Sequence, residues 1–574
     1  MIRKRSYNPE AEAKKNYIAY QNAAMYAKSD IPLHPTGGMR CLTQEEIWAD
    51  FDPYYEVLDT SSDGEIRHTF TVKSYGDDAL RTEIDVYKPA FASKRAVLIV
   101  QEYGKEVQQE IISELTKDGY TVFVPDYCKI SPNSTTYFPP YVSYGEFGRD
   151  NGHLNKVLPT AKETCPYLYT LILRRSITFI EQEFGIKDTV VIGIRDGVEY
   201  AMQTAGIDLR VRGLACICAA GYKELLPYSV YSGEEPEITH DDLAWMTGVS
   251  GVSYLKNKNI PIFVAIGSND TLSDVDRTYF LALLNGQDKF RMYVCNGYSD
   301  NVNKDCFGTL KKWLRLTFLD AKLPAMPTID VKLNNDGVVY TEVKADADAA
   351  IRSAVVYYAF DDINHETRNW IKAVCETIGK GEYIANIPIP HEDAKLFCYA
   401  HVTYENEVGV SGFITMTDFT DKRVTVTQEV SDNELYTYGG LKKAFNEHNE
   451  QPVLFTDNII GYVIPVGLKG IADKTSQMIL FVGDVTKNIE SERVMQVDCY
   501  SEEKPFDLVL CLTDDRSNKY YVTKNVYTDS TFEGVLLRCT DFKDEHFRPL
   551  TGWKNVKRLT VCTKNVVISK LLFV

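Results

Sequence analysis

The stretch TVVIGIRDGVEYAMQTAG, residues 189–206, combines three local signals that together decide the fold. Its first part, TVVIGI, is an apolar run rich in β-branched residues, typical of a strand that is buried on both faces. A turn bracketed by Gly193 and Gly197 follows, and small residues then begin a helix. The sequence therefore predicts a buried strand, a tight bend and a helix, with Arg195 at the centre of the bend.

Strands of the same kind recur through the first part of the chain. Further continuous apolar runs are AVLIVQ (96–101), YTVFVP (120–125), LACICA (214–219) and IPIFVAIG (260–267). Helical patterns such as YLYTLILRRSITFIEQEF (167–184) lie between them. Because strands and helices alternate, the sequence predicts a doubly wound, mostly parallel sheet. Two stretches before it alternate polar and apolar residues and predict an antiparallel pair: IRHTFTVKSY (66–75) and LRTEIDVYKP (80–89).

The second half of the chain nearly loses helical periodicity. A proline-spaced linker, AKLPAMPTID, separates it from the first half, and short strands at regular spacing follow. We expect four segments: helical and irregular residues 1–60, an α/β-hydrolase-like unit at 61–320, a β-sandwich at 321–420 and a jelly roll at 421–574. The fold class is thus an α/β unit followed by two all-β sandwiches.

The composition of the chain limits the classes of ligand it can bind and indicates its cellular compartment. The net charge of the 574 residues is -17, which argues against nucleic acid or an anionic membrane as the main partner. Carbohydrate or another small neutral ligand fits better. The thirteen cysteines include no C-x-x-C pair and indicate a reducing compartment. The start, MIRKRSYNPEAEAKK, has no apolar run after it, so we expect neither a signal peptide nor a membrane span, and a cytoplasmic protein.

Several of these stretches together resemble a known family. AVLIVQEYGK, LTKDGYTVFVPDY, the GIRDG bend and IPIFVAIGSND resemble the α/β hydrolases, most closely the group of acetyl xylan esterases, cephalosporin deacetylases and dienelactone hydrolases. The resemblance covers residues 61–320. It implies a catalytic triad in the chain order serine, acid, histidine, with the serine at the centre of a G-x-S-x-G bend.

Measured against that pattern, the triad is incomplete. Arg195 stands in the place of the nucleophile, and a guanidinium stays protonated and cannot attack. Asp270 matches the acid, although an aspartate in this position also serves as a turn or cap residue. The base belongs near Tyr298 in CNGYSDN, but no histidine occurs between His240 and His365. The sequence thus predicts that nucleophile and base are both missing.

Other roles remain open for the residues around the bend. Asp196 is an alternative nucleophile, although it lies one position late. Tyr103 and Gly104 retain a candidate backbone donor for an oxyanion hole. Arg195 either forms an anion site at the helix start or pairs internally with Asp270 or Asp196.

The β units resemble modules of carbohydrate-active enzymes. RNWIKA (368–373) and YAHVTYENEVGVSG suggest an immunoglobulin-like module that serves as a spacer. TDF, PLTGWKNVKRL (549–559) and ISKLLFV resemble galactose-binding-like jelly rolls, in which Trp553 is either a sugar-stacking anchor or a core residue. We expect no cofactor and no catalytic metal. A structural calcium in the jelly roll is compatible with the resemblance, but no ligand pattern locates it.

Three functions follow from these observations. The first is a catalytically degenerate esterase-like protein with a carbohydrate-related binding or assembly role. The second is an active carbohydrate esterase that uses unorthodox residues. The third is a scaffold whose β units present an interaction surface.

Overall fold

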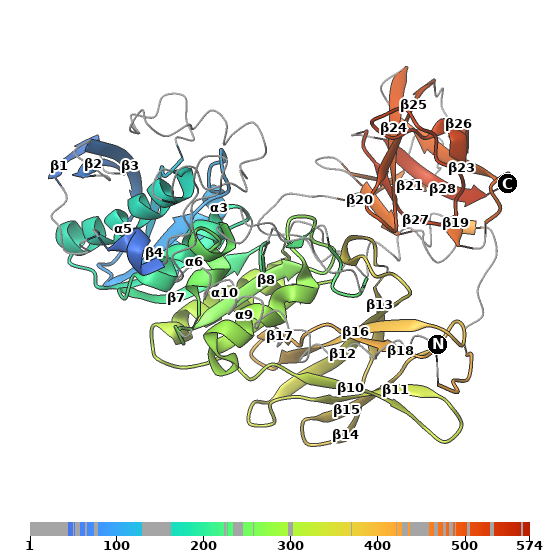
Figure 1. Cartoon of the computed structure of the whole chain (residues 1–574), viewed down its shortest axis with the longest axis horizontal. Coiled ribbons are helices and arrows are strands. Elements are labelled where there is room, and N and C mark those ends of the chain that lie inside the picture. The colour runs from blue at the N-terminus through green and yellow to red at the C-terminus, as the bar shows by residue number, and fades with distance from the viewer. Residues whose placement is uncertain are drawn as a thin grey trace, which may run out of the picture.

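Figure 1 shows the computed structural model, in which three units follow one another along the chain. The structure describes residues 44–49, 51, 58–63, 66–73, 79–128, 161, 164–222, 225–226, 228–232, 245–256, 258–296, 302–368, 370–420, 422–427, 434–436, 459–463, 469–473, 478–481, 486–487, 489–501, 505–527, 533–563 and 566–573. Within these ranges, no helix combines the length and the apolar composition that a membrane crossing requires.

The first unit is built on a nine-stranded sheet with the order β1-β2-β3-β5-β4-β6-β7-β8-β9. Strands β1 to β3 pair antiparallel, β3 joins β5 antiparallel, and the remaining pairs are parallel. This confirms the predicted mostly parallel sheet and the antiparallel pair before it. The strands are β1 (Leu58–Asp63), β2 (Arg67–Lys73), β3 (Ala79–Tyr87), β4 (Arg95–Val100), β5 (Thr121–Pro125), β6 (Asp188–Ile194), β7 (Val211–Ile217), β8 (Ile262–Gly267) and β9 (Phe290–Cys295).

Helices cover both faces of this sheet, as a doubly wound fold requires. Along β4, Leu98 and Val100 pack toward one hydrophobic cluster, whereas Val97 and Ile99 pack toward another. The first cluster includes residues of α2 (Gln44–Trp48), α5 (Cys165–Phe184), α6 (Gly197–Ile207), α8 (Gly251–Tyr254) and α9 (Thr278–Asn285). The second includes residues of α3 (Gln109–Lys117) and α10 (Lys304–Thr317).

The second unit consists of two antiparallel sheets. One has the order β10-β11-β15-β14, and the other has the order β13-β12-β16-β17 with β18 paired to β16. Their strands are β10 (Thr328–Leu333), β11 (Val339–Lys344), β12 (Ile351–Phe360), β13 (Ile371–Val374), β14 (Glu376–Gly379), β15 (Glu382–Asn386), β16 (Lys395–Tyr404), β17 (Gly409–Ser411) and β18 (Thr415–Asp418).

Strand β16 is buried on both of its faces. Leu396 and Cys398 share a cluster with the facing sheet, whereas Phe397 and Tyr399 belong to the cluster that contains α5, α6 and α9. A strand that separates two cores cannot be released from either one without exposing apolar surface. The second unit is therefore joined to the first by a shared core and does not have the loose attachment expected of a spacer.

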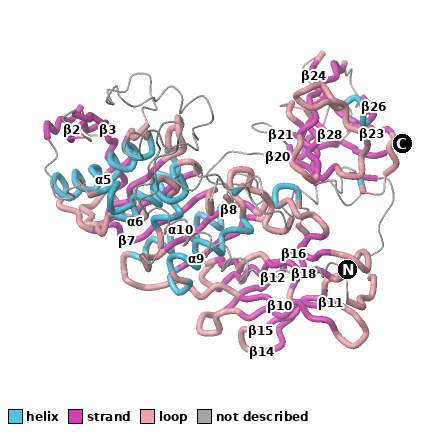
Figure 2. Tube along the Cα trace, in the orientation of Figure 1, coloured by secondary structure: helices cyan, strands magenta, loops and turns pink. Residues whose placement is uncertain are grey.

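The third unit also contains two antiparallel sheets, and it has a hydrophobic core of its own. Figure 2 shows its strands grouped apart from those of the other units. The strands are β19 (Glu434–Tyr436), β20 (Ile459–Val463), β21 (Lys469–Asp473), β22 (Met478–Phe481), β23 (Val494–Tyr500), β24 (Phe506–Asp514), β25 (Lys519–Val526), β26 (Glu533–Arg538), β27 (Val556–Val561) and β28 (Val567–Phe573).

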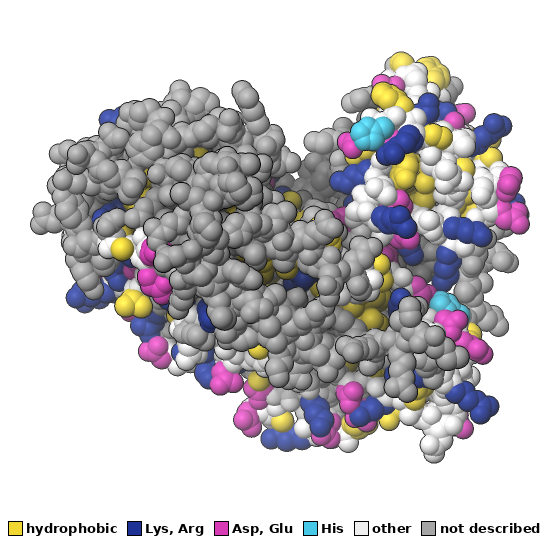
Figure 3. Space-filling view, viewed as in Figure 1, with side chains coloured by type: hydrophobic (Ala, Val, Ile, Leu, Met, Phe, Trp, Pro, Cys, Tyr) yellow, Lys and Arg dark blue, Asp and Glu magenta, His cyan; other side chains and the backbone are white. Residues whose placement is uncertain are grey.

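The described surface on the face drawn in Figure 3 carries charges of both signs. Basic and acidic side chains both occur along the third unit and along the lower edge of the second unit (Figure 3). On this face, the described part of the chain thus presents no continuous basic surface of the kind that binds nucleic acid.

Candidate functional site

The bend between β6 and α6 has the geometry of a nucleophile elbow. Arg195 has a φ of 49°, in the left-handed region that non-glycine residues seldom adopt. Its backbone N–H donates to the Ile217 carbonyl at 2.8 Å, and its carbonyl accepts from the Val198 N–H at 3.0 Å. These hydrogen bonds hold the sharp strand-to-helix turn that raises the central residue above the sheet.

The two glycines of the bend are required by close backbone contacts. A Cβ atom at Gly193 would lie 2.5 Å from the Cα of Val198, and one at Gly197 would lie 2.2 Å from the carbonyl oxygen of Val100. No side chain fits at such distances unless the backbone shifts. The bend therefore has the two glycines that a nucleophile elbow needs, and an arginine occupies its central position.

The Arg195 side chain forms an ion pair with the loop that follows β4. Its Nη1 lies 3.6 Å from Oε1 of Glu102, and the two side chains are only 12% and 15% exposed. Glu102 also contacts Lys105 Nζ at 3.0 Å. Glu102 was not among the predicted partners, Asp270 and Asp196. It lies here because β4 and β6 are neighbours in the sheet, so the residues after each strand meet at one edge.

The candidate oxyanion residues lie on the same loop as Glu102. Gly104 has a φ of +70°, and Tyr103 is half-buried with its ring centroid 6.5 Å from that of Tyr169. Burial raises the pKa of Tyr103 above its ordinary value, so its hydroxyl is uncharged at neutral pH. The loop thus supplies neutral groups beside the Arg195–Glu102 pair.

Cys128, which follows β5, carries a potentially nucleophilic thiol near this loop that no sequence motif marks. Burial raises the pKa of its thiol to about 12, while a hydrogen bond with the Gly104 backbone acts in the opposite direction. Because the thiolate is the reactive form, a thiol with this pKa is a poor nucleophile at neutral pH.

Asp270 lies in the turn after β8 and is completely buried. Its Oδ1 accepts the backbone N–H groups of Leu272 at 2.9 Å and Ser273 at 3.0 Å. Its backbone carbonyl lies 2.8 Å from Nε2 of His365. These contacts are those of a turn residue, the second of the two roles that the sequence left open.

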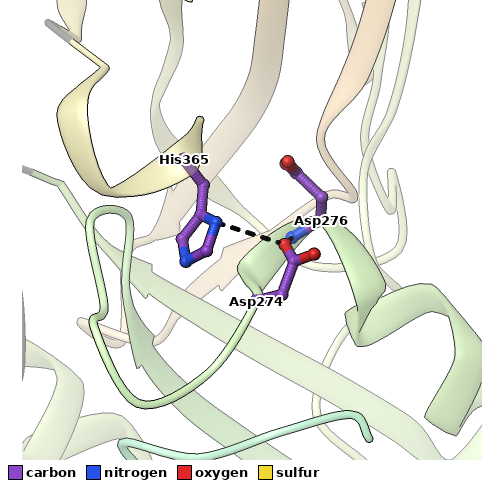
Figure 4. Close-up of side chains that lie close together, drawn as sticks. All are labelled: Asp274, Asp276 and His365. Carbon is purple, nitrogen blue, oxygen red and sulfur yellow. Dashed lines mark hydrogen bonds and ion pairs between the residues drawn. The ribbon is translucent and has the colours of Figure 1, made fainter. Parts of the chain in front are cut away.

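His365 reaches the first unit from η5 (His365–Thr367), a short helix of the second unit. Figure 4 shows it beside Asp274 and Asp276, with Nδ1 lying 3.5 Å from Oδ1 of Asp274. All three side chains are buried. Because a carbonyl oxygen only accepts, the Nε2 that faces Asp270 must carry a proton, and this nitrogen is not available as a base.

The same cluster contains two arginines. Arg368 is completely buried and donates from both Nη atoms to the two carboxylate oxygens of Asp276, each at 2.7 Å. Arg277 donates from Nε to Oδ2 of Asp274 at 2.9 Å. Burial acts to lower the pKa of Arg368, but the Asp276 carboxylate outweighs it, so this pKa is raised and the guanidinium stays charged.

The cluster of Asp274, Asp276 and His365 could be a metal site or a structural joint between the two units, and the contacts of Arg368 distinguish these two roles. Asp274, Asp276 and His365 are close enough together to hold one metal ion. However, Arg368 already occupies both oxygens of Asp276, and a metal would face this permanent positive charge. The donor set therefore does not fit a metal, and the cluster joins the first unit to the second.

The remaining predicted residues are Asp196, Tyr298 and Trp553. The Asp196 carbonyl accepts from the Glu199 N–H at 3.2 Å in the first turn of α6. Tyr298 lies outside the described residues. Trp553 is completely buried and donates its indole N–H to the Arg493 carbonyl at 2.9 Å. Its ring packs in the core of the third unit and offers no face to a sugar.

Comparisons with known proteins assign no family. No protein-family description and no curated protein matches the sequence. Among solved structures, acetyl xylan esterase 1 from Thermoanaerobacterium sp. JW/SL YS485 is 14% identical, covers 52% of this chain and 98% of its own, and gives a TM-score of 0.34. A family 15 glucuronoyl esterase from Caldicellulosiruptor kristjansonii is 12% identical. The match covers 46% of this chain and 80% of the esterase, with a TM-score of 0.33.

A third similar structure is Est1E from Butyrivibrio proteoclasticus with bound ferulic acid, which is 8% identical, covers 44% of this chain and 98% of its own, and gives a TM-score of 0.31. At these identities and scores, none of the three assigns an activity or a ligand to this chain. The strand order and the elbow themselves show a doubly wound, mostly parallel sheet with the strand-to-helix bend of an α/β-hydrolase fold.

Proposed function

We propose that this chain is a non-hydrolytic protein built on the esterase-like α/β-hydrolase fold, with a role in carbohydrate-related binding or assembly. The observation that carries the proposal is Arg195, which occupies the left-handed central position of an intact elbow and is paired with Glu102. A guanidinium has no available electron pair, so the position from which a nucleophile would attack supplies none.

The neighbouring groups do not replace the missing nucleophile and base. The Cys128 thiol is held neutral by burial, and His365 directs a protonated nitrogen at the Asp270 carbonyl. Asp270 itself is engaged with backbone N–H groups in its turn. A hydrolytic reaction would need a nucleophile activated by a base, and these described residues do not form that pair.

The proposal is tested by hydrolysis of p-nitrophenyl acetate with the full chain, Arg195→Ala and Asp196→Ala. We expect all three to match the buffer rate, while their thermal melting shows that each is folded. Turnover by the full chain that disappears in either variant would establish the rival function, an active hydrolase with unorthodox residues.

A structural scaffold is the second candidate, and the joint between the first two units favours it. The buried Arg368–Asp276 pair fixes the second unit at the turns that follow β8. In this reading, the α/β unit serves to position the β units for a partner. Binding of the isolated third unit to a glycan array would favour the carbohydrate role, whereas capture of proteins by the full chain without glycan binding would favour the scaffold.

A further inference from the structure

A cavity of about 340 Å³ lies at the edge of the first sheet that is opposite to the elbow. It is bordered by the beginnings of β7 and β9, by the residues just before β8, and by the end of α10 with the segment that follows it. The strands from β6 to β9 are parallel, so these beginnings lie at the far edge from the bend after β6. A volume of this size is enough to hold a small molecule.

Basic residues outnumber acidic residues in the wall of this cavity. The charged lining residues are Arg212, Lys289, Arg291, Lys322, Asp288 and Asp320. Arg212 Nη2 lies 2.7 Å from Oδ2 of Asp320, so these two charges offset each other. Three basic groups and one acidic group remain, in a chain whose net charge is -17. A cavity with this charge attracts anions.

Arg291 on β9 is a buried cation whose hydrogen bonds all go to uncharged groups. It is 7% exposed, and its Nε and Nη2 both donate to the Leu323 carbonyl, at 3.1 and 3.0 Å. Its Nη1 donates to the carbonyls of Asp288 at 3.0 Å and Phe290 at 2.7 Å. These bonds use four of the five N–H groups of the guanidinium. Within the described part of the chain, one N–H of Nη2 is left for a ligand.

The charge of Arg291 is not neutralised by a contacting carboxylate among the described residues. Burial lowers the pKa of Arg291, and the attraction of Asp346 and Asp288 offsets this effect only in part. A guanidinium nevertheless stays protonated in a protein. A buried charge without a counterion is unfavourable, and an anion in the cavity would supply the counterion. Lys289 adds a second positive charge, and its Nζ is held by the Asn259 carbonyl at 2.8 Å.

Apolar residues form another part of the wall. Ile260, Pro261, Trp313 and Leu323 line the cavity, and Trp313 and Leu323 are each 3% exposed. A bare inorganic ion would leave this apolar surface without a partner. A ligand that joins a charged group to an apolar body would use both parts of the wall.

We propose that this cavity binds a small organic anion, with its carboxylate or phosphate group at Arg291 and Lys289 and its apolar body against Trp313. The oxygens of such a group only accept hydrogen bonds, which matches the donors of a guanidinium and an ammonium group. The site lies at the opposite edge of the sheet from Arg195. The proposal therefore does not depend on whether the elbow is hydrolytic.

Isothermal titration of the full chain with benzoate, phenyl phosphate and benzamide tests the proposal. Benzamide has the ring and nearly the shape of benzoate but carries no charge. We expect at least one anion to bind, and benzamide to bind about tenfold more weakly than benzoate or not at all. Tighter binding of benzoate identifies a carboxylate ligand, and tighter binding of phenyl phosphate identifies a phosphate ligand.

Matched variants assign the binding to this cavity. Arg291→Met removes the buried charge, and we expect it to weaken anion binding by about tenfold. Lys289→Gln removes a charge that is partly exposed, so it should weaken binding by about threefold while disturbing the fold less. Lys304→Gln is the control, because Lys304 is at the first residue of α10 and does not line the cavity.

Thermal melting shows which variants are folded, and Lys289→Gln decides the outcome if Arg291→Met is not. Lys304→Gln should bind the anions as the unsubstituted chain does. Failure of both anions to bind, binding of benzamide equal to that of benzoate, or equal affinities in Lys289→Gln and Lys304→Gln would overturn the proposal.

Discussion

At the residue scale, the backbone and the side chain of Arg195 have to be considered separately. The backbone has the conformation of a nucleophile elbow, whereas the side chain is a guanidinium. The flanking glycines and the φ of 49° preserve the bend, although the residue in the strained position has no role as a nucleophile. Strain of this kind usually persists at functional sites. Here the Glu102 contact holds the Arg195 side chain at the centre of the bend.

Two substitutions of Arg195 should measure the backbone strain separately from the loss of the ion pair. Arg195→Ala and Arg195→Gly both remove the contact with Glu102, but glycine adopts the left-handed conformation without the penalty of a Cβ atom. We expect Arg195→Gly to be more stable than Arg195→Ala by about 1 kcal/mol, measured from their thermal transitions. An alanine variant as stable as the glycine variant would show that the backbone is not strained there.

A second residue-scale prediction concerns His401, which lies on β16 where the second unit meets β9. Burial, with a smaller contribution from Lys372, lowers the pKa of His401 to about 4. The unfolded chain has a histidine pKa of about 6.5, so it binds a proton that the folded chain does not bind between these two values. Folding should therefore lose stability as the pH falls below about 6.5, by about 2 kcal/mol at pH 5 from this group.

The measurement is the fall in melting temperature between pH 7.5 and pH 5 in the full chain and in His401→Gln. The variant cannot take up the proton, so its melting temperature should fall less. His546→Gln serves as the control, because the His546 side chain is 65% exposed and should behave like the unsubstituted chain. Equal pH dependence in all three proteins would contradict the assigned role of His401.

At the element scale, most strands of the first unit could be predicted because they are apolar runs with their own boundaries, and β2 and β3 because polar and apolar residues alternate along them. Strand β1, with the sequence LDTSSD, has neither pattern and was not predicted. Strand β6 could be predicted from TVVIGI, and the bend after it from GIRDG. The contacts of the site could not be predicted in this way. The residue pairs Asp270–His365 and Asp276–Arg368 are 95 and 92 residues apart, and no spacing rule connects them. Three acids after β8 were the available signal, but a sequence does not show their partners.

The joint between η5 and the turns after β8 makes a prediction of its own. Arg368→Met would leave the Asp276 carboxylate buried without its partner, and it should destabilise the chain by about 3 to 5 kcal/mol. The double variant Arg368→Met/Asp276→Leu removes both charges and should recover a large part of the loss. Thermal melting of the three proteins measures both effects.

An ion pair with an exposed arginine provides the comparison for this joint. Arg548 and Asp544 contact each other at 2.7 Å, with the Arg548 side chain 72% exposed. Arg548→Met should lower the melting temperature much less than Arg368→Met does, because solvent screens the charge of the exposed Arg548 guanidinium. If Arg368→Met were equally mild, the buried pair would not be holding the two units together.

At the scale of the whole molecule, the three units differ in how they are joined. The first and second share hydrophobic clusters on both faces of β16, and the Val294 N–H of β9 donates to Ser411 Oγ of β17 at 2.9 Å. The third unit keeps a separate core. Its described contacts with η5 are polar and include the hydrogen bond from Arg558 Nη1 to the Glu366 carbonyl at 3.3 Å.

This difference predicts how the chain tolerates truncation. Residues 1–427 keep both halves of the shared core, so this fragment should remain folded and melt close to the first transition of the full chain. Residues 1–320 lose β16 and β17, which uncovers apolar side chains of the first unit, so this fragment should aggregate or melt at a much lower temperature. Solubility and circular dichroism of both fragments measure these outcomes. A stable, monomeric 1–320 fragment would show that the first unit does not depend on the second, and the fused core would then have no part in holding the α/β fold together.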